Sequence, residues 1–168
     1  MLRNCWQVLA VGLAFVSSAS CGPRVDLSKL AVTDTFTGWY DNGIKDGKNH
    51  LVPSLSFRLQ NNGEAPASYV QLTVSFWMKD ADGNYDEREV SGIGGTAVPP
   101  GGTSEPILVR ATLGYTLEGP RADLFSHSQF RDVTARVVAK RDGRPVRIGE
   151  VAIDRRLIPH SVQSNASR

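Results

Sequence analysis

The sequence has no long hydrophobic run and only two cysteines among its 168 residues. Its longest apolar stretch is Val8–Val16, whereas a helix that crosses about 30 Å of hydrocarbon needs about 20 apolar residues. The stretch is therefore too short to predict a membrane-spanning helix. It suits the apolar part of a secretory signal peptide instead, because Arg3 precedes it and small residues follow it.

Patterns that carry hydrolytic, metal or nucleotide chemistry are also missing. There is no Gly-x-Ser-x-Gly turn for a nucleophilic serine. The three histidines, His50, His127 and His160, are too scattered to form a His-x-x-x-His zinc pair. The glycine-rich stretch 91–103 has no lysine, so it predicts a connector and not a phosphate-binding loop. We therefore expect no cofactor, and a periplasmic enzyme of unknown type ranks last among the functions considered.

The two cysteines bear on how the N-terminus is processed. Cys5 lies within residues 1–20, which we expect to be removed, so Cys21 is the only cysteine of the mature chain and no internal disulfide is expected. The residues Ala19-Ser20-Cys21 resemble the lipobox of bacterial lipoproteins, in which the cysteine receives diacylglycerol and becomes the new N-terminus. Ser18 departs from that pattern, and ordinary signal peptidase cleavage followed by secretion is the alternative. Lipidation also explains an otherwise exposed, unpaired thiol.

Size and charge indicate one domain with an uneven charge distribution. Removal of residues 1–20 leaves 168 − 20 = 148 residues, enough to fold without a disulfide or a metal. Residues 21–106 hold 7 Lys and Arg against 11 Asp and Glu, a net charge of −4. Residues 107–168 hold 11 against 6, a net charge of +5. An exported chain this close to neutral overall is not expected to bind nucleic acid.

Apolar and polar residues alternate along most of the chain. The clearest alternating runs are residues 30–37, 54–60, 70–76 and 133–140. A period of two predicts half-buried antiparallel strands. Residues 107–112 and 146–153 predict two more strands, the second bulged at Gly149.

Turn signals separate these runs. They are Asn61–Gly63, Asp82–Gly83 and Asp142–Gly143. One short helical turn is expected within residues 124–130. About seven strands without a repeated strand–helix–strand pattern predict an all-β fold, an immunoglobulin-like antiparallel β-sandwich.

The strand and turn pattern resembles a known kind of domain. Pro53-x-Leu55-x-Phe57-x-Leu59-x-Asn61-x-Gly63, then Val70-x-Leu72-x-Val74-x-Phe76, then Asp82-Gly83, is similar to the core of FxLYD-type and related immunoglobulin-like domains of bacterial exported proteins. Pro99–Gly102, Leu113-Gly-Tyr115 and Pro120-Arg-Ala122 are similar to a family of small exported proteins of this kind. The resemblance covers most of residues 29–158. It implies the sandwich fold and no catalytic residue.

One loop carries a candidate metal site. Asp80, Asp82, Asn84 and Asp86 place oxygen atoms at alternate positions, as do the first ligands of a calcium-binding loop. The glycine of that loop stands at the fourth position and not the sixth, and a serine stands where a bidentate glutamate belongs. The stretch is more typical of an exposed hairpin tip. Calcium-assisted adhesion or interaction is the alternative function.

The basic half of the chain predicts a charged face. Arg136 and Lys140 lie on the outward side of one predicted strand, Arg147 lies on the next, and Arg155 and Arg156 follow it. A hairpin would bring several of these onto one surface that could attract anionic lipid, lipopolysaccharide or an acidic partner. A solvated edge whose charges prevent aggregation is the alternative.

Together these features predict a lipid-anchored envelope protein. We expect a signal peptide over residues 1–20, a tether over 21–28, the sandwich over 29–158 and a flexible tail over 159–168. In lipoproteins of the enterobacterial type, Gly22 after the cysteine would imply sorting to the outer membrane, facing the periplasm. The predicted function is binding or scaffolding of an unidentified protein or envelope component.

Overall fold

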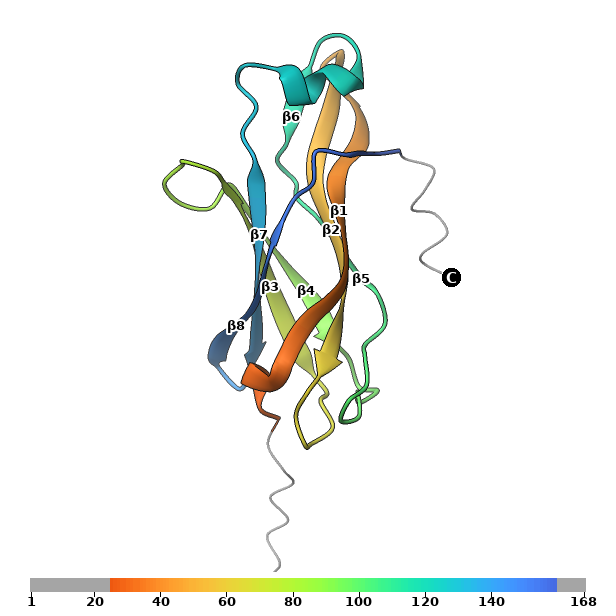
Figure 1. Ribbon diagram of the computed structural model, residues 1–168, viewed down its shortest axis with the longest axis vertical. Coiled ribbons are helices and arrows are strands. Elements are labelled where there is room, and N and C mark those ends of the chain that lie inside the picture. Colours follow the sequence, from red (N-terminus) through yellow and green to blue (C-terminus); the bar gives the residue numbers. More distant parts are fainter. Residues whose placement is uncertain (1–24, 160–168) are drawn as a thin grey trace, which may run out of the picture.

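The computed structural model describes residues 25–159, which form two β-sheets packed face to face (Figure 1). The predicted signal peptide, Cys21 and residues 160–168 lie outside the described residues. Two short 3₁₀ helices, η1 (Leu27–Lys29) and η2 (Arg121–Ser126), accompany the strands. The strands are β1 (Leu30–Lys45), β2 (Lys48–Asn61), β3 (Val70–Met78), β4 (Asp86–Ile93), β5 (Ile107–Arg110), β6 (Tyr115–Leu117), β7 (Val133–Arg141), β8 (Arg144–Ala152) and β9 (Leu157–Ile158).

The pairing of these strands confirms the predicted all-β sandwich. One sheet has the order β5-β2-β1-β9, with β6 also paired to β2, and the other has the order β4-β3-β7-β8. Every pair of strands is antiparallel except β1 with β9, which is parallel and was not expected from the sequence.

The predicted alternation of apolar and polar residues determines which side chains are buried between the two sheets. The buried residues of β7 are Val133, Ala135, Val137 and Ala139, and the residues between them are partly exposed. The central strands β3 and β2 contribute Phe76 and Phe57, which are among the largest fully buried side chains. Each large apolar side chain buried in this way contributes about 1.5–3 kcal/mol to stability.

The predicted turn at Asp142–Gly143 and the predicted bulge are found where the sequence indicates them. Asp142–Gly143 joins β7 to β8, and both residues have the positive φ of a two-residue hairpin turn, 51° and 81°. In the β7–β8 pair, Val137 is opposite Gly149 but Val138 is opposite Arg147. Ile148 is therefore the extra residue of a β-bulge next to Gly149.

β1 and β2 form a hairpin much longer than the alternation predicts. Its turn is Asp46–Gly47, again with positive φ at both residues, 51° and 76°. The register of the pair shifts between Thr33 and Phe36 and again between Asp41 and Ile44. These irregularities break the period of two, so the sequence pattern of the first strand ends about eight residues too early.

β9 closes one edge of the sheet against β1. Leu157 and Ile158 pair in parallel with β1, and the Trp39 N–H donates to the Arg156 carbonyl at 2.7 Å. Gly38 permits this approach, because a Cβ at that position would lie 2.8 Å from both the Arg156 carbonyl oxygen and Ile158 Cγ1. The absence of a side chain at Gly38 is thus what lets β9 pack against β1.

Aromatic rings fill the end of the core that lies near η2. The ring of Trp39 lies 5.5 Å from that of Tyr115 and 5.3 Å from that of Phe130, measured between centroids. The helical turn predicted within residues 124–130 is found slightly earlier, as η2, which starts at Arg121 and ends at Ser126. After η2, the Phe130 N–H donates to the His127 carbonyl at 2.9 Å. η2 and η1 lie at opposite ends of the sandwich (Figure 1).

Gly38→Ala tests whether the packing of β9 against β1 requires a glycine at this position. We expect it to lower the free energy of unfolding by about 1–3 kcal/mol, the usual effect of overpacking a filled site. Gly94→Ala is the matched control, because nothing lies within 4 Å of a Cβ there and its φ is not positive. Urea unfolding measures both variants. Equal stabilities would contradict the role given to Gly38.

Candidate functional site

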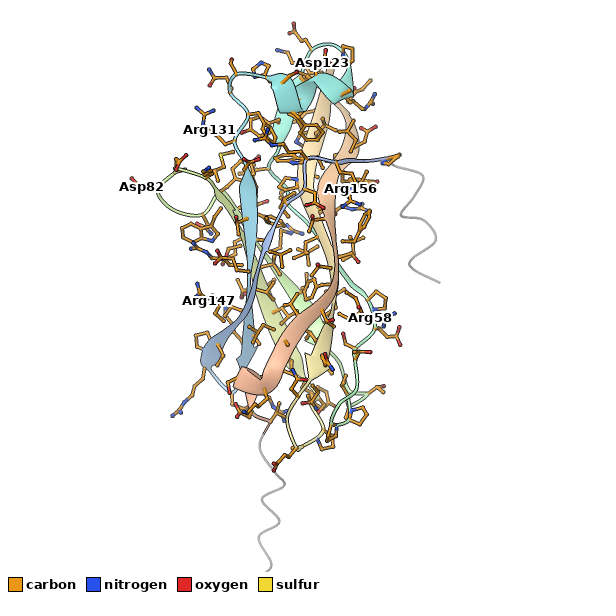
Figure 2. The ribbon with its side chains drawn as sticks, in the orientation of Figure 1. Arg58, Asp82, Asp123, Arg131, Arg147 and Arg156 are labelled. Carbon is orange, nitrogen blue, oxygen red and sulfur yellow. The ribbon has the colours of Figure 1, made fainter. Side chains whose placement is uncertain are left out.

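The predicted basic residues do not all lie on one surface. Arg136 and Lys140 alternate with buried residues of β7, so they point away from the core. Arg147 is opposite the outward residue Val138 and projects from β8 (Figure 2). Arg155 and Arg156 lie in the link between β8 and β9. The structure therefore brings together three of the five predicted cations on the outer face of the β4-β3-β7-β8 sheet.

Those three cations are all paired with carboxylates. Glu150 Oε2 lies 3.0 Å from Arg136 Nε and 3.5 Å from Arg147 Nη1. Lys140 Nζ lies 3.3 Å from Glu89 Oε1. These pairs are exposed, so each adds little to stability. Their carboxylates nevertheless compensate the positive charge, and the face offers little net charge to an anionic surface.

The other two arginines hold the link that leads into β9. Arg155 Nε and Nη2 donate to the two carboxylate oxygens of Asp132 at 2.8 and 2.9 Å, and this hydrogen bonding lowers the pKa of Asp132. The guanidinium of Arg156 lies 4.6 Å from the centroid of the Phe36 ring, on the other sheet. Both contacts fix the position of the chain just before β9.

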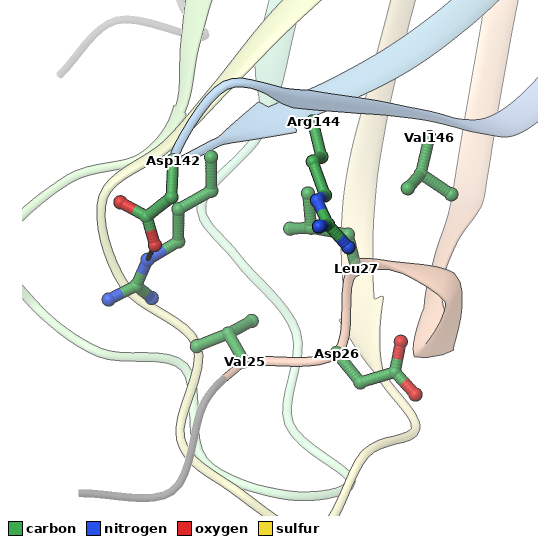
Figure 3. A pocket seen from close by; sticks show the side chains of 7 residues that line it. Val25, Asp26, Leu27, Asp142, Arg144 and Val146 are labelled. Atoms are coloured by element: carbon green, nitrogen blue, oxygen red, sulfur yellow. Dashed lines mark ion pairs between the residues drawn. The ribbon is translucent and has the colours of Figure 1, made fainter. Parts of the chain in front are cut away.

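Two hollows flank the β7–β8 turn. The first, of about 560 Å³, lies beside the start of the described chain, where Val25 and Leu27 approach Arg144 and Val146 (Figure 3). The second, of about 600 Å³, lies over β3 on the outer face of the sheet. We call the second the Tyr69 hollow. Its lining includes Tyr69, Gln71, Thr73, Glu89, Lys140 and Asp142.

Of the residues that line the Tyr69 hollow, only Lys140 was predicted from the sequence to have a functional role. Tyr69 is the aromatic member of the set, and 66% of its surface is exposed. Its φ is 54°, a left-handed conformation that is uncommon for residues other than glycine, asparagine or aspartate. The sequence around Tyr69 does not predict this left-handed conformation, because it is held by a contact with a distant loop, in which the Tyr69 N–H donates to the Gly94 carbonyl.

The residues of the candidate calcium loop lie at the β3–β4 connection. Asp82 is at its exposed tip (Figure 2). The carboxylate of Asp86 is already used in a contact with another segment of the chain. It accepts hydrogen bonds from the backbone N–H groups of Thr112 and Leu113, the second at 3.1 Å. Within residues 25–159, no three His, Cys, Asp or Glu side chains lie close enough together to hold a metal ion. Calcium binding by Asp80, Asp82, Asn84 and Asp86 stays a prediction that calcium titration can test.

The described histidines lie in different surroundings. His50 is buried on β2, where Asn42 Nδ2 lies 3.2 Å from its Nδ1. Burial, with a smaller effect of the positive charge on Lys45, lowers the pKa of His50. His127 is exposed after η2, and its Nδ1 accepts the Gln129 N–H at 3.2 Å. His160 lies outside the described residues.

Comparisons with known proteins add little to this picture. No family model matches the sequence, and no curated protein matches it. A solved structure assigned provisionally as a β-galactosidase from Bacteroides fragilis is 17% identical, with a TM-score of 0.38, over 74% of this chain and 15% of that chain. A likeness of this size does not bear on function.

Among residues 25–159, none of the helices has the length and apolar character needed to cross a bilayer.

Asp86→Ala tests whether this carboxylate joins two segments of the chain. We expect it to lower the free energy of unfolding by about 0.5–1.5 kcal/mol, because it removes the hydrogen bonds that the backbone N–H groups of the exposed residues 112 and 113 donate to this carboxylate. The same loss is expected with and without 5 mM calcium, whereas Asp82→Ala, at the exposed tip, serves as the control. A loss that appears only with calcium would favour the calcium site instead.

The burial of His50 predicts a pH-dependent stability. Its folded pKa lies below the ordinary value of 6.5, so the unfolded chain binds the proton more readily and stability falls as the pH drops below about 6.5. Asp132 also has a lowered pKa, but it contributes only as the pH falls toward about 4. Thermal unfolding at pH 7.5 and pH 5 should show a loss that His50→Gln reduces and the exposed control His127→Gln does not. An unchanged loss in His50→Gln would contradict this assignment.

Proposed function

We propose that the chain is a non-enzymatic lipoprotein of a bacterial envelope whose sandwich acts as a binding or scaffolding module. Acyl chains on Cys21 hold it at the outer membrane, facing the periplasm. The resemblance of Ala19-Ser20-Cys21 to a lipobox supports the anchor, and Gly22 supports the choice of membrane. The β-sandwich supports a binding role, because it presents rigid sheet faces and clustered loops to a partner.

The observation that carries this proposal is how soon the fold begins after Cys21. Leu27 is buried in the core, and η1 contacts β7 and β8. Val25 follows Cys21 by four positions, and four extended residues span at most about 14 Å. An acylated Cys21 would therefore keep the η1 end of the sandwich close to the bilayer. This short connection suits a domain that works at the membrane surface.

Cys21→Ser tests the anchor. One fourteen-carbon chain binds membranes with a constant of only about 10⁴ M⁻¹, whereas two or more chains anchor stably. We expect the wild type to incorporate labelled palmitate and to partition into the detergent phase. Cys21→Ser should be exported, unlabelled and soluble in the periplasm, because the apolar stretch Val8–Val16 is unchanged.

Cys5→Ser is the matched control for the loss of a cysteine. Cys5 lies in the segment expected to be removed, so this variant should be labelled and anchored like the wild type. A wild-type chain that is unlabelled and soluble, with a free thiol at Cys21, would overturn the anchor and favour simple secretion.

A further inference from the structure

The Tyr69 hollow has the size and accessibility of a small-ligand site. Its volume of about 600 Å³ falls within the range of about 300–1,000 Å³ that is common for such sites. It lies over β3 and is bounded by β4 on one side and by β7 and its turn on the other. All the residues that line it are described, so its walls belong to the folded domain.

Tyr69 presents an aromatic ring to this hollow from a backbone conformation that destabilises the folded state. A left-handed backbone costs a residue with a Cβ about 1–2 kcal/mol, and the Tyr69 N–H holds this conformation by donating to the Gly94 carbonyl at 2.9 Å. The ring lies over Gly95, where a Cβ would be only 3.2 Å from the tyrosine Oη. A glycine backbone thus supports a ring that is largely exposed. Exposed aromatic surface held in this way is typical of a binding site.

The charged groups around the ring balance one another. Lys140 and Glu89 form one ion pair at 3.3 Å, and Arg141 and Asp142 form a second at 3.7 Å. Two positive and two negative groups give no net charge that would attract an anion or a cation. They do offer hydrogen-bond donors and acceptors side by side, and the Gln71 amide adds one of each. A neutral ligand with many hydroxyl groups can use both kinds.

Thr73 lines the hollow and carries a buried hydroxyl group that has no partner among the described residues. Thr73 is only 6% exposed, and no described residue forms a hydrogen bond with its Oγ1. The ion pair between Lys140 and Glu89 crosses β3, the strand that carries Thr73, because β3 lies between the strands that carry those two residues. A buried unpaired hydroxyl costs about 1–3 kcal/mol. A ligand hydroxyl that reaches it when Lys140 and Glu89 move apart would satisfy it.

We propose that the Tyr69 hollow binds a neutral saccharide. The face of the sugar ring, which carries C–H groups, packs on Tyr69, and its hydroxyl groups pair with Gln71, Thr73 and the Lys140–Glu89 pair. This inference rests on the proposed function, since it gives a ligand class to the binding module. It does not require that Cys21 be acylated.

Titration calorimetry of the processed chain carrying Cys21→Ser tests the site apart from the anchor. The probes are neutral oligomers of N-acetylglucosamine, glucose, mannose and galactose at millimolar concentration. We expect at least one of them to bind, and Tyr69→Ala to weaken that binding by about tenfold or more. Tyr69→Phe should bind within about twofold of the parent, because the ring remains.

Phe36→Ala is the matched control, because it removes another partly exposed ring on the other sheet. Its affinity should equal that of the parent, and circular dichroism should show every variant folded. Failure of the whole neutral panel to bind would overturn the saccharide site, as would binding that Tyr69→Ala leaves unchanged. A sulfated oligosaccharide that binds more tightly than the neutral panel would overturn it too. Palmitate labelling reports on the anchor independently, so the two failures are distinguishable.

Discussion

The β1–β2 hairpin holds one sheet together, because every other strand of that sheet pairs with one of its two arms. β5 and β6 pair with β2, and β9 pairs with β1. The hairpin also supplies Trp39, Leu55 and Phe57 to the core, where they meet the buried faces of β3 and β7. The second sheet therefore packs on a surface whose position is set by one turn, Asp46–Gly47, and by two irregularities in register.

The fold could be predicted from the sequence wherever the alternation was regular. The buried apolar residues of β3 and β7 follow a period of two, and the pattern found them because an antiparallel strand that packs one face on the core must alternate. The far part of β1 could not be found, because bulges move its side chains from one face to the other. β9 has only two residues and is held by Gly38 and Arg156, which are contacts made across the domain.

The candidate site also depends on contacts between distant parts of the chain, which the sequence pattern does not reveal. Counting charges along the chain separates an acidic half from a basic half, yet folding mixes the two. Glu89 of the acidic half pairs with Lys140 of the basic half across β3, and within the basic half Glu150 pairs with two arginines. A cationic face predicted from sequence thus becomes a nearly balanced surface. The left-handed backbone that turns Tyr69 outward also depends on a distant segment, the loop at Gly94 and Gly95.

The parallel pairing of β9 with β1 has a consequence for the order of folding. The first long strand receives its last partner from residues 157 and 158, and the Asp154 N–H donates to Thr37 Oγ1 at 3.0 Å across a separation of 117 residues. Contacts between such distant parts of a chain form slowly, because a large loop must close before they are made. The sheet therefore cannot be completed until the C-terminal part of the domain has been synthesised. A growing chain stays open at the Gly38 edge until then.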